Sequence, residues 1–147
     1  MNRITVERTI AAPAAAVFNA VADIRQFSQA IPEIVKYEFL TGPQSGAGTR
    51  FRETRLMKGK ESTTELQVTE YEENRHVRMV ADSHGTVWDT VFRVEPGQAA
   101  TKLTVVMDAK SYQVLPKLMF PFIRGMVRRS IEQNMDCVKR FCEKRET

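Results

Sequence analysis

The sequence predicts an α+β fold in which an antiparallel sheet is covered by one long C-terminal helix. Between residues 33 and 109, six consecutive segments alternate apolar and polar side chains, and short turns join them. Residues 116–144 instead carry apolar side chains at spacings of three and four, which is typical of a helix with one apolar face. A sheet with one apolar face needs a cover. The C-terminal segment is the only predicted element long enough to provide it.

One strand and two short helices are predicted before the six consecutive strands. Residues 2–10 alternate apolar and polar side chains, which predicts a first strand. Two short helices are expected at 14–21 and 23–31, because Pro13 suits the start of the first and Asp23 can cap the second. The six later strands are expected at 33–40, 49–57, 61–71, 75–81, 86–94 and 101–109. Their short connections indicate an antiparallel meander.

Length and composition indicate one globular unit. A chain of 147 residues has the size of one ordinary domain, and we expect residues 1–147 to form a single domain. Apolar residues make up 42% and charged residues 27%, which excludes a disordered chain. No segment approaches the ~18 apolar residues that span a membrane, and the N-terminus has no apolar run of signal-peptide length. Cys137 and Cys142 have neither CxxC nor metal-pair spacing, so we expect free thiols and a cytoplasmic protein.

The chain is basic, with a formal net charge of +4. Basic side chains gather on the outer face of the last helix, at Arg124, Arg128, Arg129, Lys139 and Arg140. Such a face is most often simply solvated, and it would also favour weak contact with an anionic membrane. The aromatic residues alternate like core residues and are not interleaved with basic ones, so we expect no nucleic-acid binding.

The C-terminal helix has one irregular position. Pro121 removes a backbone donor and clashes with the preceding turn, so we expect a kink near Phe120 and a regular helix from about Pro121. Gly125, one turn later, would ease movement of this end. We therefore predict a gate at the N-terminal end of the helix.

This order of elements resembles the helix-grip fold of the START-like (SRPBCC) superfamily, which includes the polyketide cyclase/dehydrase and lipid transport family and the Bet v 1 allergens. The local matches are VERTIAAPAAAVFNAVADI, GAGTRFRETRLMKGK, TELQVTEYEENRHVRMV and TVWDTVFRVEPGQAATKLTVVMD. The resemblance covers essentially the whole chain. It implies a seven-stranded curved antiparallel sheet wrapped around the C-terminal helix, with two short helices between strands one and two. It also implies a large apolar cavity between the sheet and the last helix.

The resemblance further implies that inward side chains of the sheet and the apolar face of the helix line this cavity and bind a ligand. The expected ligand-binding residues are Val35, Tyr37, Phe39, Phe51, Glu53, Arg55, Leu66, Met79, Trp88, Phe92, Met107, Met119, Ile123, Met126 and Ser130. Apolar walls with a few polar groups are typical of ligand pockets, and methionine adapts well to such a wall. Each apolar member of this set could instead serve ordinary core packing.

Strand 49–57 offers the most specific polar chemistry. Glu53 and Arg55 share a face with Phe51, so they point inward if Phe51 does. They could pair with each other, bind a polar end of the ligand, or be solvated where the strand bends. Desolvation of a buried carboxylate favours its protonated form, which makes Glu53 the candidate general base of an enzyme. Tyr37 is a further polar group that could orient a ligand.

Other chemistry finds little support in the sequence. His76 and His84 have no carboxylate or second histidine at metal-ligand spacing, so no metal is expected. No Ser-His-Asp set, GxSxG or phosphate-binding loop is present, and no cofactor is expected.

The sequence and the family resemblance leave three functions open. The sequence favours a non-enzymatic binding or carrier protein, monomeric or homodimeric, for a hydrophobic small molecule such as a lipid, isoprenoid or polyketide-like ligand. One alternative is a metal-free polyketide cyclase, aromatase or dehydratase that acts in the same cavity with Glu53 as base. The other is a membrane-associated lipid or quinone chaperone that uses the basic face of the last helix.

Overall fold

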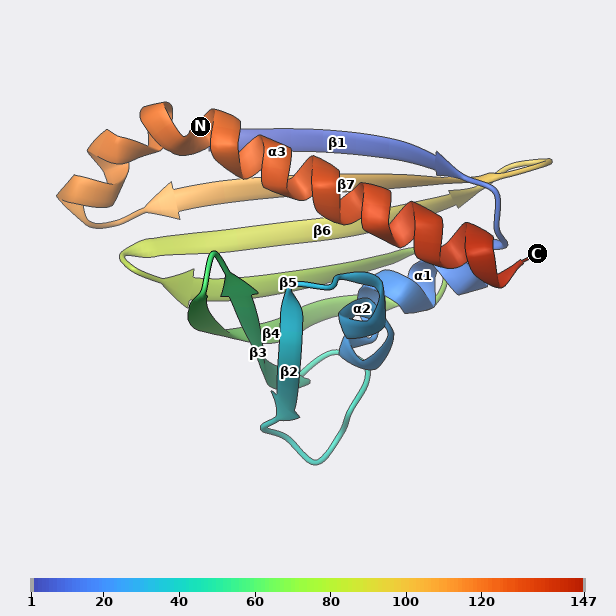
Figure 1. Cartoon of the computed structure of the whole chain (residues 1–147). Helices are drawn as coiled ribbons and strands as arrows, with labels where there is room; N and C mark the ends of the chain where they lie inside the picture. Colours follow the sequence, from blue (N-terminus) through green and yellow to red (C-terminus); the bar gives the residue numbers. More distant parts are fainter. Residues whose placement is uncertain (1, 147) are drawn as a thin grey trace.

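The computed structural model describes residues 2–146 and confirms the expected α+β architecture (Figure 1). The strands are β1 (Asn2–Ile10), β2 (Ile34–Phe39), β3 (Arg50–Met57), β4 (Lys60–Glu72), β5 (His76–Ser83), β6 (Thr86–Pro96) and β7 (Thr101–Ser111). The helices are α1 (Ala14–Ala22), α2 (Ile24–Ala30) and α3 (Val114–Arg145).

The seven strands form one antiparallel sheet in the order β1-β7-β6-β5-β4-β3-β2. The first strand therefore pairs with the last, and β2 forms the far edge. Figure 1 shows α3 running along one face of the curved sheet, with α1 and α2 beside its C-terminal half. Residues paired across neighbouring strands share a face, as Phe51 does with Leu66 and Met79 with Thr90. This arrangement directs the apolar side chains of the strands toward α3.

The two short helices begin as the sequence predicts. Pro13 lies immediately before α1 in an extended conformation, and the Asp23 side chain caps α2 by accepting a hydrogen bond from the backbone N–H of Arg25 at 2.9 Å. Val17 and Phe18 of α1 are completely buried against the sheet. These contacts hold α1 and α2 over one end of the concave face.

The start of α3 differs from the prediction. The helix begins at Val114 and contains Pro121, so the expected start near Pro121 is wrong. Its first turns nevertheless run in a different direction from the rest (Figure 1), as expected when a proline removes one helical hydrogen bond. The beginning of the helix is held at the β5–β6 turn, where the Tyr112 hydroxyl donates to Asp82 at 2.8 Å. Among the described residues, no helix is long and apolar enough to cross a membrane.

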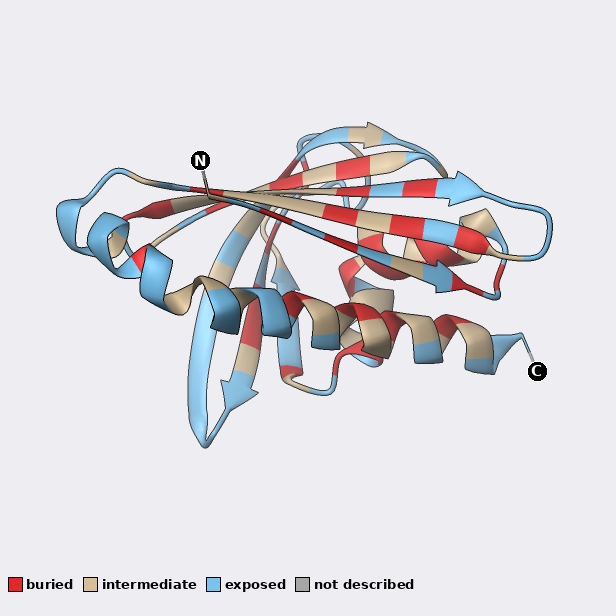
Figure 2. Ribbon diagram, turned by 90° about the horizontal axis from the view of Figure 1, so that it is seen from above, coloured by how far each residue is buried: buried red, intermediate tan, exposed pale blue. Residues whose placement is uncertain are grey.

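The two halves of α3 are buried very differently. In the second half, Ile131, Met135, Val138 and Cys142 form a buried stripe at spacings of three and four. In the first half of the helix as described, only Phe120 is buried. Figure 2 shows this contrast as a largely exposed beginning and a regularly buried end. The later turns of α3 therefore anchor the helix to the core.

The convex face of the sheet is polar. Arg78 on β5 donates to Asp89 on β6 and to Glu70 on β4, which joins three neighbouring strands. Arg3 makes a similar pair with Asp108 across β1 and β7, at 2.9 Å. The sheet thus has a charged outer face and an apolar inner face.

Candidate ligand cavity

A cavity of about 400 Å³ lies between the concave face of the sheet and the helices. The strands supply Phe51, Glu53, Arg55, Met57, Thr64, Leu66, Met79, Ala81, Ser83, Trp88, Thr90, Phe92, Val105 and Met107, and the helices supply Val21, Ile24, Phe27, Val127, Ser130, Ile131, Asn134 and Met135. Most of these side chains are apolar. Both the volume and the lining are typical of a site for a small organic molecule.

Much of the predicted ligand-binding set lies on this wall. The residues concerned are Phe51, Glu53, Arg55, Leu66, Met79, Trp88, Phe92, Met107 and Ser130. The eight strand residues of this set share one origin, because alternation places every second side chain of a strand on the concave face, whereas Ser130 lies on α3. Their contact with a ligand remains a prediction.

The predicted residues of β2 lie outside the cavity. Tyr37 is paired with Glu53 and shares its face, but β2 is the edge strand and Tyr37 is 40% exposed. A bulge between Ile34 and Lys36 shifts the register at Val35, which is also exposed. Phe39 is paired with Phe51 and packs against the core, with its ring centroid 6.5 Å from that of Phe51, but it does not line the cavity. The placement of these residues in the pocket was therefore wrong.

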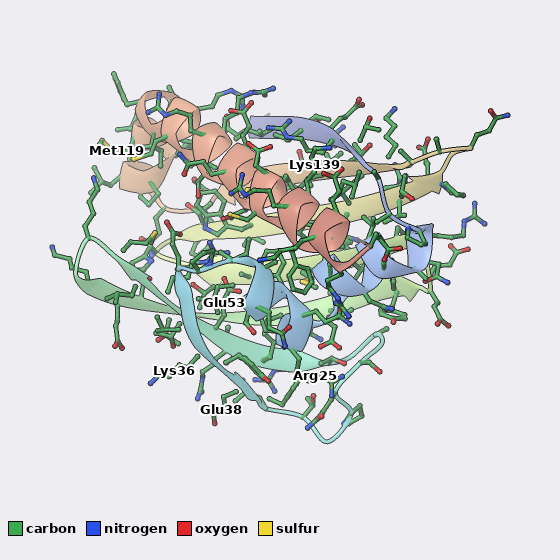
Figure 3. The ribbon with its side chains drawn as sticks, turned by 45° about the vertical axis from the view of Figure 1, so that its right-hand side comes forward. Arg25, Lys36, Glu38, Glu53, Met119 and Lys139 are labelled. Carbon is green, nitrogen blue, oxygen red and sulfur yellow. The ribbon has the colours of Figure 1, made fainter. Side chains whose placement is uncertain are left out.

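The predicted residues in the first half of α3 also lie outside the lining. Met119 and Met126 are exposed on the outer side of the helix, and Ile123 packs against the core without reaching the cavity. Figure 3 shows Met119 at the beginning of α3, far along the helix from Lys139. This half of the helix has apolar residues on two sides, so their spacing alone did not indicate which side faces the sheet.

Several lining residues were missed by the sequence reasoning. Val21, Ile24 and Phe27 reach the cavity because α1 and α2 fold over its end. Thr64 and Thr90 have the same phase as their apolar neighbours on β4 and β6, so the alternation could have identified them. The positions of the helical residues depend on tertiary packing, which the alternation does not report.

The polar part of the cavity centres on Arg55. Glu53 is only 9% exposed, and its Oε1 accepts a hydrogen bond from Nε of Arg55 at 3.0 Å. The Nη1 group of Arg55 donates to Oδ1 of Asn134 on α3 at 3.4 Å and lies 3.6 Å from Oε2 of Glu33. In Figure 3, Glu53 lies inside the molecule, whereas Lys36 and Glu38 extend outward from β2. One guanidinium therefore faces two carboxylates and an amide oxygen.

This cluster leaves polar atoms available to a ligand. Within residues 2–146, no fully buried side-chain nitrogen or oxygen lacks a hydrogen-bond partner. Oε2 of Glu53 accepts no hydrogen bond from a described residue, so this oxygen is not fully buried, and Glu53 lines the cavity. Nδ2 of Asn134 and the hydroxyl of Thr64 also lie in the lining residues without a partner in the described chain. The cavity thus presents both acceptors and donors beside an apolar wall.

Other reactive groups lie elsewhere. Burial raises the pKa of the Cys142 thiol to about 11, and neither this thiol nor Cys137 lines the cavity. Within the part of the chain that the structure describes, no cluster of histidine, cysteine and acidic residues could hold a metal ion. The carboxylate, guanidinium and amide of the polar cluster are therefore the ionic and amide groups that a bound molecule would meet.

The helix-grip architecture and its apolar cavity define a START-like protein. Residues 1–143 match the family described as "Polyketide cyclase / dehydrase and lipid transport", and the chain belongs to this family. No curated protein matches the sequence at a significant level.

Solved structures share the fold at low sequence identity. Ara h 8.0201 is 17% identical with a TM-score of 0.76, and the match covers 95% of this chain and 96% of that one. A START superfamily protein from Mycobacterium smegmatis is 19% identical with a TM-score of 0.70, covering 97% and 95% of the two chains. The di-domain ARO/CYC protein BexL of the BE-7585A biosynthetic pathway is 16% identical with a TM-score of 0.82. That match covers 97% of this chain and 47% of BexL, so the chain spans about half of BexL.

Proposed function

We propose that this protein binds and carries a hydrophobic small molecule, such as a lipid, isoprenoid or polyketide-like compound, in the cavity between the sheet and α3. The observation that carries this proposal is the apolar cavity of about 400 Å³ with one polar cluster in its wall. Burial of the ligand would supply affinity at roughly 25 cal/mol per Å² of apolar surface. The description of the family supports both lipid transport and polyketide chemistry.

The polar cluster favours a ligand whose polar end is neutral. Arg55 already faces the carboxylates of Glu53 and Glu33, so a ligand carboxylate would meet negative charge beside the guanidinium. A ligand hydroxyl could instead donate to Oε2 of Glu53, and a ligand carbonyl could accept from Nδ2 of Asn134. The preferred class is therefore an apolar molecule with a hydroxyl or keto group.

A displacement assay tests both the binding of a hydrophobic molecule and the preference for a neutral polar end. The neutral fluorescent probe N-phenyl-1-naphthylamine is bound to the protein and displaced with dodecanol or with dodecanoate at neutral pH. We expect dodecanol to displace the probe at least about tenfold more effectively, which corresponds to about 1.4 kcal/mol. Equal or better displacement by dodecanoate would contradict the preference for a neutral end. Failure of the probe and of both competitors to bind would contradict the carrier function itself.

A second candidate is an enzyme of the cyclase, aromatase or dehydratase type. The presence of Glu53 in the cavity wall and the likeness to the ARO/CYC protein BexL support it. In this case Glu53 would act as a general base toward a polyketide-like substrate. A Glu53→Gln protein that keeps ligand affinity but loses turnover would favour the enzyme, and absence of turnover with every tightly bound polyketide-like compound would favour the carrier.

The proposal includes the compartment, the domain and the oligomeric state in which the protein acts. We place the protein in the cytoplasm as one ligand-binding domain over residues 1–147, acting as a monomer or homodimer. The free thiols of Cys137 and Cys142 support a reducing compartment.

A further inference from the structure

The first half of α3 has an apolar outer face that no described part of the chain covers. Its exposed large apolar side chains are Val114, Leu115, Leu118, Met119, Phe122 and Met126, with Phe122 82% exposed. Figure 2 shows the same turns as mostly exposed. We call these six residues the outer apolar face.

This face is additional to the one that packs on the sheet. Val114, Leu118, Phe122 and Met126 are spaced by four and lie along one side of the helix. Phe120 is buried and its ring lies 6.1 Å from that of Trp88, so the sheet is contacted by a different side. A surface helix needs only one apolar side for its own fold, and a second contiguous one indicates an interaction site.

The charge of the surrounding chain is strongly positive. Between Ala109 and Ile131 there is no aspartate or glutamate, while Lys110, Lys117, Arg124, Arg128 and Arg129 are all basic. Acidic residues return in the second half of the helix, where Lys139 is paired with Glu143 at 2.7 Å. The two halves of α3 carry equal numbers of basic residues, but only the first half lacks acidic ones, so the net positive charge lies mainly in the first half, beside the outer apolar face.

We infer that the first half of α3 docks on an anionic membrane surface. The outer apolar face would enter the interface between headgroups and acyl chains, and the flanking lysine and arginine side chains would lie among the headgroups. A second copy of the chain is a poorer occupant, because a symmetric pairing of this face would bring like charges together. The positive charge around the outer apolar face therefore favours an anionic lipid surface over a second copy of the chain.

The position of the docking face also relates it to the cavity. Val127 and Ser130, the next residues along α3, line the cavity, and the exposed Met57 lines it from β3. Docking would therefore hold one wall of the cavity near the membrane. Transfer of a ligand between membrane and cavity rests on the proposed carrier function, whereas docking itself does not.

Co-sedimentation with vesicles tests the inference on the ligand-free protein. Vesicles of phosphatidylcholine with phosphatidylglycerol are compared with vesicles of phosphatidylcholine alone, at about 50 mM and about 500 mM NaCl. We expect binding to the anionic vesicles that weakens in high salt. Phe122→Ser should reduce binding at least about tenfold, and Lys117→Gln about fivefold.

Matched controls lie on other surfaces. Val35→Ser removes an exposed apolar side chain from β2, and Arg75→Gln removes an exposed basic side chain from the β4–β5 turn. Both should bind vesicles like the unmodified protein, and thermal melting should show all four variants folded. Equal binding to both vesicle types, or equal losses in the controls, would overturn the inference. So would a dimer in light scattering that Phe122→Ser dissociates and that does not bind vesicles.

Vesicle binding and probe binding test membrane docking and ligand carriage independently. Vesicle binding without any probe binding would support docking and contradict the carrier function. Probe binding without vesicle binding would support the carrier and overturn docking.

Discussion

Nε of Arg55 donates to Oε1 of Glu53 at 3.0 Å inside the cavity wall, between two residues of the same face of β3. The pair satisfies one oxygen of a nearly buried carboxylate and leaves the other without a hydrogen-bond partner among the described residues. The same guanidinium reaches Asn134 on α3, so the pair also links the sheet to the helix. The cluster that links β3 to α3 is therefore also part of the cavity lining.

Removal of the guanidinium should destabilise the fold. Arg55→Ala leaves Glu53 in the cavity wall without its hydrogen-bond donor, and we expect a loss of about 1–3 kcal/mol in the free energy of unfolding. The double variant Glu53→Gln with Arg55→Ala should be less destabilised than the sum of the single changes, because no carboxylate is left unpaired. Urea unfolding measures both. Additive losses would show that the two side chains do not interact.

Filling the cavity should abolish binding without unfolding the protein. Thr90 lines the cavity on β6, and Thr90→Phe places a ring in the space of about 400 Å³. We expect affinity for N-phenyl-1-naphthylamine to fall at least about tenfold, with a change in unfolding free energy within about 1–3 kcal/mol. Thr104→Phe on the opposite face of the sheet is the matched control. Unchanged probe affinity in Thr90→Phe would mean that the probe binds elsewhere.

Pro121 should control movement at the beginning of α3. Pro121→Ala restores a helical hydrogen-bond donor, and we expect a stability gain of up to about 3 kcal/mol and slower release of a bound ligand. Trp88 lines the cavity close to Phe120, so its fluorescence can follow release in stopped-flow experiments. Pro116→Ala in the first turn of the helix is the control, because proline is tolerated there. An unchanged release rate in Pro121→Ala would contradict the predicted gate.

The Arg3–Asp108 pair should contribute stability that is lost in acid. The hydrogen bond from Arg3 is the main cause that lowers the pKa of Asp108 below its ordinary value. Because the folded pKa is lower than the unfolded one, the contribution is fully present above the unfolded pKa of about 4 and disappears as the pH falls through the folded pKa. Thermal melting should show the unmodified protein slightly more stable than Asp108→Asn near pH 6, and this difference should shrink as the pH falls through the folded pKa of Asp108. A difference that grows in acid would contradict this assignment.

Most of the fold followed from local patterns. The period of two along β3 predicts that Phe51, Glu53 and Arg55 share one face, and in the structure all three line the cavity. The same reasoning located Trp88 and Phe92 on β6, because each strand buries alternate side chains wherever it lies in the sheet. Alternation along one strand therefore predicted which side chains share a face, and contact of these side chains with a ligand stays a prediction.

The sequence by itself determined the order of the elements, the alternation of each strand and the shared face of Glu53 and Arg55, whereas the structure turned that face inward. Only the tertiary structure decided how far along the sheet the cavity extends, and it excluded Tyr37 because β2 is an edge strand. It also turned Met126 outward and brought Asn134 to Arg55, across 79 positions of the sequence. The physical reason is that periodicity reports which side chains share a face, whereas a contact between distant segments depends on how those faces pack.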